Sequence, residues 1–278
     1  MNYQWYPGHM TKAKRMMQEN IKLIDLIIEL VDARIPCSSR NPDIDEMGKN
    51  KFRIVLLNKS DLADPAWNKR WMDWFENQGI HALEINSKTG AGIRSINGLV
   101  QEACREKLER DRKRGIVNRP VRAMVAGIPN VGKSTFINSF AGKACTKTGN
   151  KPGVTRGKQW IRLNKELELL DTPGILWPKQ EAGAGMRLAL IGSMNDDVII
   201  PEELACDLLG CLRELCPEAV EKRYGILWQE TLALTLEEIA RSRGCFAKGD
   251  SLDLKKASGL LTDDFRKGKL GRITLERP

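Results

Sequence analysis

The segment 127–134, Gly-Ile-Pro-Asn-Val-Gly-Lys-Ser, constrains the fold of this chain more than any other feature. The apolar run 121–126 before it is typical of a buried strand, and residues 134–138 after it read as the start of a helix. A strand, a glycine-containing loop and a helix N-terminus in this order predict a P-loop, whose backbone N–H groups and helix dipole bind phosphate. The alternative is a chance match in a turn, and the flanking strand and helix argue against it.

Four residues have expected roles toward the phosphates. Lys133 supplies positive charge at the β- and γ-phosphates, and the Ser134 hydroxyl is suited to ligate Mg²⁺. Farther along, Asp171-Thr-Pro-Gly174 follows the strand-like run 166–170. We therefore expect Asp171 to hold Mg²⁺ through water and the Gly174 N–H to meet the γ-phosphate.

The loop between these two motifs offers a further metal ligand. In 151–157, Lys-Pro-Gly-Val-Thr-Arg-Gly, Thr155 is the candidate threonine of a loop that closes over the γ-phosphate and completes the metal site. Thr146 and Thr148 lie nearby as alternatives, because threonine is common in loops. We prefer Thr155, since its glycine neighbours allow the backbone to move.

A second motif predicts which purine base is bound. Asn-Lys-Ser-Asp at 58–61 directly follows the short strand-like run 53–57. Asp61 can accept from the two N–H donors on the Watson–Crick edge of guanine, Lys59 can lie along the ring, and Asn58 can tie this loop to the P-loop. A further strand, 81–85, runs into 86–90, whose backbone is expected to close over the base. Together with the P-loop, the tetrad predicts selection of GTP over ATP.

The order of these motifs predicts a permuted fold, because the base-reading tetrad precedes the P-loop. A strand at 25–31 and a helix at 11–24 open the chain, and a helix at 93–114 with its exit at 115–120 makes the connection that permutation demands. We expect an α/β domain over residues 1–178, with a mostly parallel sheet flanked by helices. Beyond it, apolar residues at helical spacing predict a smaller, all-α domain over 179–278.

The motifs 58–61, 127–134 and 171–174, with Pro-Gly-His-Met at 7–10 and Val-Asp-Ala-Arg-Ile-Pro at 31–36, resemble those of the circularly permuted GTPases, and within them the bacterial ribosome biogenesis GTPase A family. The resemblance covers the GTPase half well and the C-terminal part only in length and helical character. It implies GTP hydrolysis with Mg²⁺ and a checkpoint role in late assembly of the large ribosomal subunit, with rRNA bound.

Two residues gain roles through this resemblance. Ile175 stands where many small GTPases carry the glutamine that orients water, so hydrolysis should be slow alone, and the family implies that His9 compensates. The alternative is that His9 packs or contacts RNA. Asn130 is similar to the P-loop asparagine of GTPases that bind K⁺ beside the phosphates, and the alternative is that it stabilises the loop.

The expected site residues follow from both lines of reasoning. Those for the nucleotide are Asn58, Lys59, Ser60, Asp61, Asn86, Ser87, Asn130, Val131, Gly132, Lys133, Ser134, Thr135 and Gly174; those for catalysis are His9, Lys133 and Thr155; those for metals are Ser134, Thr155 and Asp171 for Mg²⁺ and Asn130 for K⁺.

Composition agrees with a polyanionic partner. The 278-residue chain has a formal net charge of +9, which favours a polyanionic partner. The family resemblance implies that this partner is the large ribosomal subunit with its rRNA, and we expect neither DNA nor a membrane as partner. Its seven cysteines form no C-x-x-C pair and are expected to be reduced, mostly buried thiols of a cytoplasmic protein, monomeric off the ribosome. The expected RNA-binding face comprises Lys248, Lys255, Lys256, Arg266, Lys267, Lys269 and Arg272.

Some interpretations stay open at this stage. Arg34 contacts nucleotide or RNA, or forms a structural salt bridge, and the basic run 110–114 touches rRNA or is a solvated helix end. The rival functions are an RNA-linked GTPase that acts on the small subunit or on tRNA, and an RNA-binding scaffold that holds nucleotide without turnover.

Overall fold

The computed structural model describes residues 8–116, 119–146, 159–177 and 183–278. Its centre is a six-stranded sheet in the order β3-β2-β1-β4-β6-β5, parallel except for β5 at one edge. The strands are β1 Leu26–Asp32, β2 Phe52–Asn58, β3 His81–Glu84, β4 Val121–Gly127, β5 Gln159–Arg162 and β6 Leu167–Asp171.

The register of the sheet brings the sequence motifs to one edge. Leu30 of β1 pairs with Gly127 of β4, and Asp32 pairs with Asn58 at the end of β2. On the other side of β4, Val125 pairs with Asp171. Because parallel strands all point the same way, the loops that follow β1, β2, β4 and β6 meet at their carboxyl ends, where α/β proteins bind ligands.

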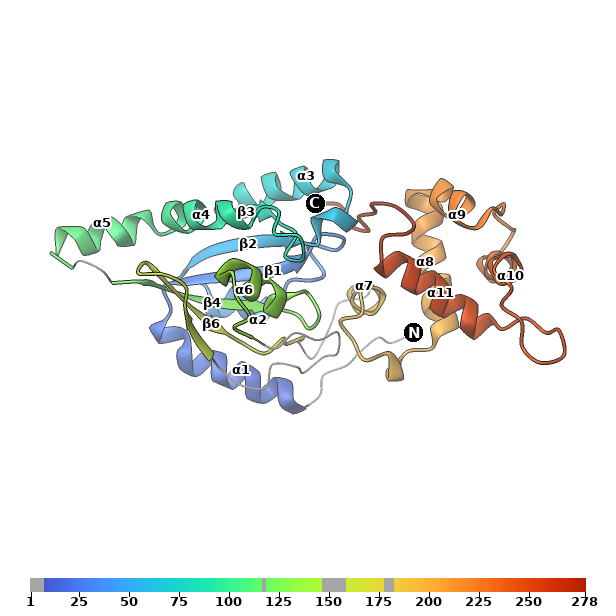
Figure 1. Ribbon diagram of the computed structural model, residues 1–278, viewed down its shortest axis with the longest axis horizontal. Helices are drawn as coiled ribbons and strands as arrows, with labels where there is room; N and C mark the ends of the chain where they lie inside the picture. Colours follow the sequence, from blue (N-terminus) through green and yellow to red (C-terminus); the bar gives the residue numbers. More distant parts are fainter. Residues whose placement is uncertain (1–7, 117–118, 147–158, 178–182) are drawn as a thin grey trace.

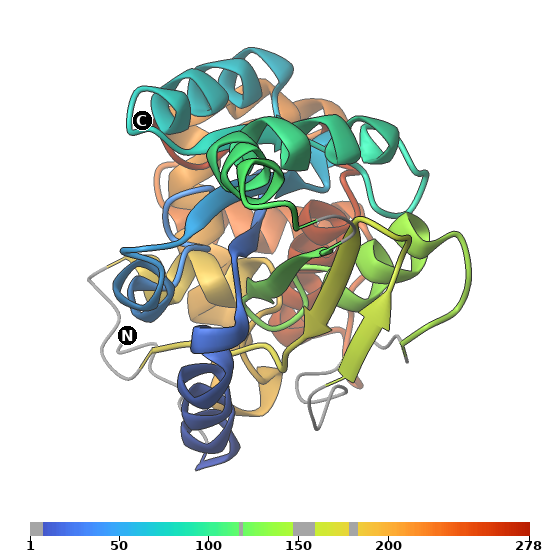
Figure 2. The ribbon, with the colours of Figure 1, turned by 90° about the vertical axis from the view of Figure 1, so that its left-hand side faces the viewer.

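Helices cover both faces of this sheet (Figures 1 and 2). The α3 helix packs Trp71 and Phe75 against Val55 and Leu57, whereas α4 belongs to the core on the opposite face with Ile54 and Leu56. Runs of apolar residues on both faces of β1 and β2 are what a central parallel sheet requires. The helices of this sheet lobe, residues 8–177, are α1 Gly8–Asn20, α2 Pro42–Met47, α3 Pro65–Glu76, α4 Ile96–Ala103, α5 Arg105–Lys113 and α6 Lys133–Ala141, with 3₁₀ turns η1 Ile21–Leu23, η2 Ser60–Leu62 and η3 Ile93–Ser95.

Residues 183–269 form a helical lobe at one end of the elongated molecule (Figure 1). In α8, the residues Leu204, Leu208 and Leu212 are buried at the spacing that the sequence predicts, and they face α11. The helices are α7 Ala184–Leu190, α8 Pro201–Leu215, α9 Pro217–Tyr224, α10 Leu232–Ser242 and α11 Leu254–Arg266, with the 3₁₀ turn η4 Asp196–Val198.

After α11 the chain leaves the helical lobe and returns to the sheet lobe, ending near α3 (Figure 1). This C-terminal tail, residues 270–278, is anchored by Glu276, whose carboxylate accepts from the N–H groups of Cys37 and Ser38 at 2.7 and 3.1 Å. Its Leu275 N–H donates to the carbonyl of Arg34 at 2.8 Å. The tail therefore packs on the loop that follows β1.

Two expectations need correction. The single helix expected over 93–114 is divided into η3, α4 and α5, because α4 ends at Ala103 and α5 begins at Arg105. The cysteines form no disulfides, but only Cys104 and Cys245 are buried, whereas Cys37 is exposed and the other four are half-buried. Among the described helices, none has the combined length and apolar character needed to cross a membrane.

Candidate nucleotide site

The P-loop has the backbone shape that its glycines predict. Gly127 and Gly132 have φ values of +151° and +102°, and Asn130 has φ +58°. A Cβ at Gly132 would lie 2.5 Å from Asn58 Nδ2, so only glycine fits there. The loop ends in α6, whose first turn carries Lys133, Ser134 and Thr135. Backbone N–H groups at such a helix start form an anion site.

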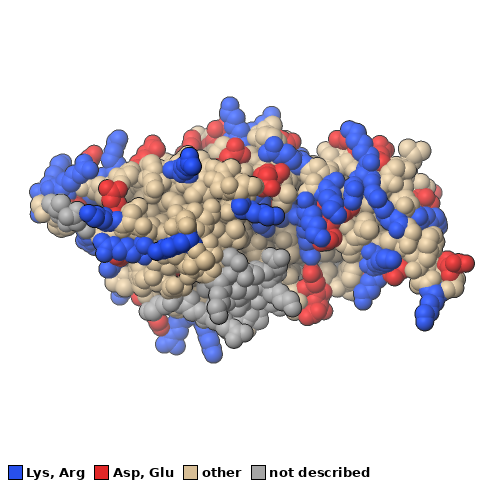
Figure 3. All heavy atoms as spheres, in the orientation of Figure 1, with Lys and Arg blue, Asp and Glu red and all other residues tan. Residues whose placement is uncertain are grey.

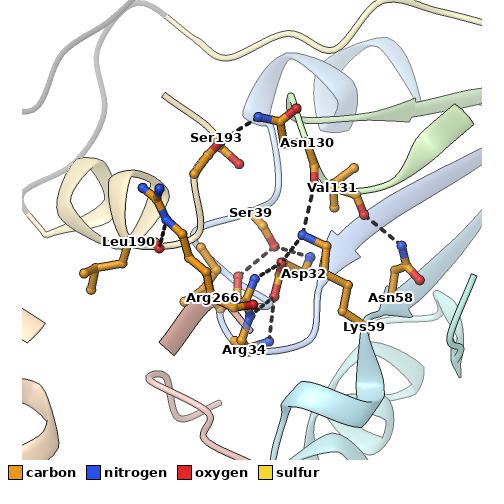
Figure 4. Close-up of polar contacts among 12 residues, drawn as sticks. Asp32, Arg34, Ser39, Asn58, Lys59, Asn130, Val131, Leu190, Ser193 and Arg266 are labelled. Carbon is orange, nitrogen blue, oxygen red and sulfur yellow. Dashed lines mark hydrogen bonds and ion pairs between the residues drawn. The ribbon is translucent and has the colours of Figure 1, made fainter. Parts of the chain in front are cut away.

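Asn58 joins the base-reading loop to the P-loop (Figure 4). Its Nδ2 donates to the Val131 carbonyl at 2.8 Å, and its Oδ1 accepts from the Ser87 N–H at 3.0 Å. The side chain is 2% exposed. Loops separated by more than seventy residues in the chain are thus held by one amide, as the tetrad interpretation requires.

Lys59 makes a second connection between these loops. Its Nζ donates to the Asn130 carbonyl at 3.0 Å and forms an ion pair with Asp32 Oδ2 at 3.0 Å. Lys59 itself has φ +59°, an uncommon conformation for a residue with a side chain. Burial lowers the pKa of Lys59, although the carboxylate of Asp32 acts in the opposite direction.

Arg34 takes the structural role that the sequence left open. Its guanidinium donates to both oxygens of Asp32 at 2.8 Å, and its carbon Cζ lies 5.2 Å from the centre of the Phe265 ring in α11. Asp32 is fully buried, and the pKa of its carboxyl is nevertheless well below the ordinary range, because Arg34 and Lys59 outweigh the effect of burial.

Around the expected base position, the tetrad and the loop after β3 supply different groups. Asp61 is exposed and available for a ligand, whereas Ser60 is fixed by its N–H, which donates to the Ile85 carbonyl at 3.2 Å. Asn86 closes a turn by accepting from the N–H groups of Lys88 and Thr89. Among the described residues, the Ser87 hydroxyl is buried without a hydrogen-bond partner.

The phosphate-sensing segment packs directly on the P-loop. A Cβ at Gly174 would lie 2.8 Å from Lys133 Nζ and from Pro129 Cα, so the backbone of this segment touches the P-loop. Asp171 is 1% exposed and its Oδ1 has no hydrogen-bond partner among the described residues. Burial raises the pKa of Asp171 to about 6, against the lowering effect of Lys133.

Lys133 lies inside the loop that it serves. Its Nζ donates to the carbonyls of Gly127 and Ile128 at 3.0 and 2.9 Å. Burial lowers its pKa to about 8, although Asp171 raises it. These two carbonyls accept from two of the three N–H groups of the ammonium, so one donor remains for a phosphate.

Two expected residues, His9 and Thr155, depend on parts of the chain that the structure does not describe. Thr155 and its alternative Thr148 lie outside the described residues, as does the side chain of His9, whose backbone is in the first turn of α1. Thr146 is described, and its hydroxyl donates to the Ser134 carbonyl at 3.2 Å. Ile175 is buried, as its apolar side chain predicts.

Sequence reasoning missed the contacts that the helical lobe makes with the P-loop. Asn130 Nδ2 donates to the Gly192 carbonyl at 2.7 Å, and the Ser193 hydroxyl donates to the Pro129 carbonyl at 2.8 Å. Arg266 of α11 supports this segment through the carbonyls of Ala189 and Leu190 (Figure 4). These partners lie in a stretch without a recognisable motif, so no signal in the sequence identifies them.

The expected RNA-binding cations divide into two groups. Four make internal bonds: Arg266 pairs with Asp196, Lys267 with Asp263, Lys269 with Asp264, and Arg272 donates to backbone carbonyls. Their charges are thus partly used within the chain, which the spacing of basic residues could not reveal. Lys248, Lys255 and Lys256 are exposed.

Comparison with known proteins agrees with this site. The family described as "50S ribosome-binding GTPase" matches residues 122–202. Ribosome biogenesis GTPase A of Bacillus pumilus is 45% identical over 280 residues, covering 100% of this chain and 99% of that protein. The protein of the same name from Thermotoga maritima is 32% identical over 275 residues, covering 99% and 94%.

Solved structures agree in fold. GDP-bound YlqF of T. maritima superposes with a TM-score of 0.68 at 27% identity, covering 94% of this chain and 98% of that one. The GNP-bound form of T. maritima YlqF gives a TM-score of 0.66 at 29% identity, covering 96% and 98%. With a P-loop tied to a guanine-type tetrad, and with relatives that match over its full length, the chain belongs to the ribosome biogenesis GTPase A family.

Proposed function

We propose that this GTPase acts as a checkpoint in late maturation of the large ribosomal subunit, binding rRNA while GTP is bound and leaving after hydrolysis. The observation that carries the nucleotide part is the Asn58 side chain, which bonds the guanine-type loop to the P-loop at 2.8 Å. The target is supported by the names of the full-length relatives. A +9 net charge supports a polyanionic partner.

The distribution of charge also favours RNA. Lys and Arg side chains gather at the end of the molecule formed by α5 and again over the helical lobe (Figure 3). The last turn of α5 carries Arg110, Arg112 and Lys113. Cations spread over two ends of an elongated molecule fit phosphates of a folded RNA, because shape and backbone contacts dominate recognition of such surfaces.

For hydrolysis, we assign the phosphates to the P-loop N–H groups and Lys133, and the γ-phosphate also to the Gly174 N–H. Mg²⁺ would be held by Ser134 and Thr155, with Asp171 acting through water, and would neutralise charge on the phosphate oxygens. The buried, unpartnered Oδ1 of Asp171 fits such an ion, since a cation nearby would stabilise the carboxylate against burial. Asn86, Ser87 and Asp61 would surround the base.

His9 is our candidate for orienting the attacking water. Ile175 is buried and has no polar group for this task, and its carbonyl already accepts from Asn41. Met10, the neighbour of His9, is fully buried, and its sulfur accepts from the N–H of Leu176 at 3.4 Å. The start of α1 therefore adjoins the segment that follows Gly174, which supports a position for His9 near the γ-phosphate.

K⁺ is our second candidate for assistance, through Asn130. The amide nitrogen of Asn130 is engaged by Gly192, and the amide oxygen is the atom that a cation requires. We expect hydrolysis to be faster in KCl than in NaCl at equal ionic strength. Equal rates in the two salts would exclude the K⁺ role and leave Asn130 as a link between the P-loop and the helical lobe.

We further propose that residues 1–178 act as the GTPase domain and residues 179–278 as a helical, RNA-binding domain whose orientation follows the nucleotide. The contacts of Asn130 and Ser193 join the P-loop to this domain, and the segment after Gly174 leads into it. A shift of the γ-phosphate contacts would bias the position of the helical lobe. We also propose that the protein is a monomer off the ribosome and works in the reducing cytoplasm, a compartment with which cysteines without disulfides agree.

The experiment is multiple-turnover GTP hydrolysis by the full chain with purified large subunits, small subunits, tRNA or no addition. We expect slow basal turnover that only large subunits accelerate. Acceleration by small subunits or tRNA would transfer the role to those partners, and absence of turnover in every arm would indicate a nucleotide-holding scaffold. Binding to large subunits should be tighter with a non-hydrolysable GTP analogue than with GDP, and equal binding would remove the proposed release step.

A further inference from the structure

The C-terminal tail bonds to the loop that carries the base-reading carboxylate. Arg272 donates from Nε to the Ala63 carbonyl at 2.9 Å and from Nη2 to the Ser60 carbonyl at 3.0 Å. The Ile273 N–H donates to the Leu62 carbonyl at 3.0 Å, and the Thr274 hydroxyl accepts from the Asp64 N–H at 3.1 Å. Four hydrogen bonds thus join residues 272–274 to residues 60–64.

These bonds enclose Asp61 on both sides. The guanidinium of Arg272 bridges a carbonyl before Asp61 and another after it, and a planar fork of this kind fixes direction as well as distance. The loop between them is the single 3₁₀ turn η2, whose Ser60 carbonyl accepts from the Ala63 N–H at 3.4 Å and from Asn68 Nδ2 at 3.3 Å, both longer than its 3.0 Å bond from Arg272. Asp61 is itself exposed, so its position depends on the backbone at either side.

The packing beneath the turn is close as well. A Cβ at Gly268 would lie 2.7 Å from Cδ2 of Leu62, so the chain leaving α11 passes directly against η2. Ile273 and Thr274 are buried. The tail is therefore part of the support of this loop, although it follows the helical lobe in the chain.

We infer that Arg272 is a positioning residue for guanine selection: by fixing the Ser60 and Ala63 carbonyls, it holds the Asp61 carboxylate where it can accept from both N–H donors of guanine. This inference rests on the proposed role of Asp61. Without the guanidinium of Arg272, the Asp61 carboxylate would accept from only one of the two N–H donors of guanine at a time. Selectivity for the 2-amino group then falls, because a poorly aligned hydrogen bond contributes little.

The tail has anchors that do not involve Arg272. Glu276 is held by the N–H groups of Cys37 and Ser38, and the Trp71 indole donates to the Glu276 carbonyl at 3.4 Å. Replacing Arg272 should consequently leave the tail in place and disturb the loop locally. That separation makes the inference testable without unfolding the lobe.

The test compares binding of GTP and ITP to the full chain by calorimetry. Inosine lacks the 2-amino group and keeps the N1–H, so the ratio of the Kd for ITP to the Kd for GTP reports the second donor alone. For Arg272→Ala we expect GTP binding to weaken about tenfold, equivalent to one lost hydrogen bond, and the ratio to fall at least about threefold. Arg272→Lys should fall between this variant and the parent, because an ammonium bonds one carbonyl without the fork.

Two further variants complete the design. Arg277→Ala removes a matched arginine from the same tail; Arg277 stacks on Trp67 and bonds carbonyls of the tail itself, not the loop. We expect its Kd ratio to stay within about twofold of the parent, on the order of the change seen for surface substitutions. Asp61→Ala should abolish the discrimination and defines its lower limit.

The outcomes separate the two ideas. A lowered ratio in Arg272→Ala and Asp61→Ala, with Arg277→Ala like the parent, supports the inference. An unchanged ratio in Arg272→Ala beside a lowered one in Asp61→Ala overturns the inference and keeps the role of Asp61. An unchanged ratio in both Arg272→Ala and Asp61→Ala overturns the inference about Arg272 and also the proposed role of Asp61. Thermal unfolding of each variant shows whether it is folded, and a folded Arg272→Lys serves if Arg272→Ala is not.

Discussion

Replacing Asn58 by alanine should uncouple the two halves of the nucleotide site. The substitution removes the partners of the Val131 carbonyl and the Ser87 N–H, which belong to residues that are 0% and 4% exposed. Each buried group left without a partner costs about 1–3 kcal/mol, so the loss in free energy of unfolding should be roughly 2–6 kcal/mol. The side chain also fills the space over Gly132, where alanine leaves a gap.

The assays are urea and thermal unfolding of the nucleotide-free protein, followed by calorimetry with GTP. A loss of about 2 kcal/mol or more should lower the melting temperature by at least about 4 °C in a chain of this size. GTP affinity should also fall about tenfold, because binding must then order the two loops. We take the free energy of that ordering to be about that of one hydrogen bond.

The control is Asn77→Ala, at the exposed end of α3, where we expect a change within about 0.5 kcal/mol. If the free energy of unfolding of Asn58→Ala also stays within about 0.5 kcal/mol of the parent, and its GTP affinity is unchanged, the idea that the Asn58 amide holds the site together is refuted.

Three other changes test separate parts of the site. Burial raises the pKa of Asp171 to about 6, so its carboxyl stabilises the nucleotide-free fold below pH 4 and this contribution is lost as the pH rises to about 6. Relative to Asp171→Asn, the free energy of unfolding should therefore fall by about 3 kcal/mol over that window, and parallel curves would contradict the assignment. Asp32→Ala should cost about 3–5 kcal/mol in urea unfolding, because it leaves the buried Arg34 guanidinium unpaired, and a loss below about 1 kcal/mol would show that Arg34 finds another partner. His9→Ala should lower subunit-stimulated turnover and leave GTP affinity intact, and unchanged stimulated turnover would end the proposal for His9.

Most of the sheet could be predicted because its strands are short apolar runs next to motifs. The runs 25–31, 53–57, 81–85, 121–126 and 166–170 correspond to β1, β2, β3, β4 and β6 within one or two residues. The antiparallel β5 was missed, since of its four residues only Ile161 is buried. No alternation of apolar and polar residues marks such an edge strand.

The α3 helix was missed although its signal is present. Asp64 caps the helix by accepting from the Ala66 N–H at 2.8 Å, and Pro65 opens the first turn. Trp67, Trp71 and Phe75 then recur every four residues, which is the helical period. The C-terminal tail is different, because it has no regular structure, and the bonds of Arg272 to residues some 210 positions earlier depend only on the tertiary fold.

Within the candidate site, the motifs predicted which loops meet, and the structure identifies the bonds that join them. The expected link from Asn58 to the P-loop is present. The shared position of Asp32, Arg34 and Lys59 could not be predicted, because a salt bridge between residues two apart and a third residue from another strand depends on side-chain direction at the strand ends. Hydrophobic patterns carry no information of that kind.

The return of the tail to the sheet lobe has a consequence for synthesis of the chain. The ribosome produces η2 some 210 residues before it produces residues 272–274, which bond to this turn. At roughly 5–20 residues per second, that interval lasts about 10 to 40 s. Once residue 134 has been made, a nascent chain contains both nucleotide motifs but still lacks the bonds that the tail gives the base-reading loop. The base-reading loop gains these bonds only after residues 272–274 have been made and have emerged from the translating ribosome.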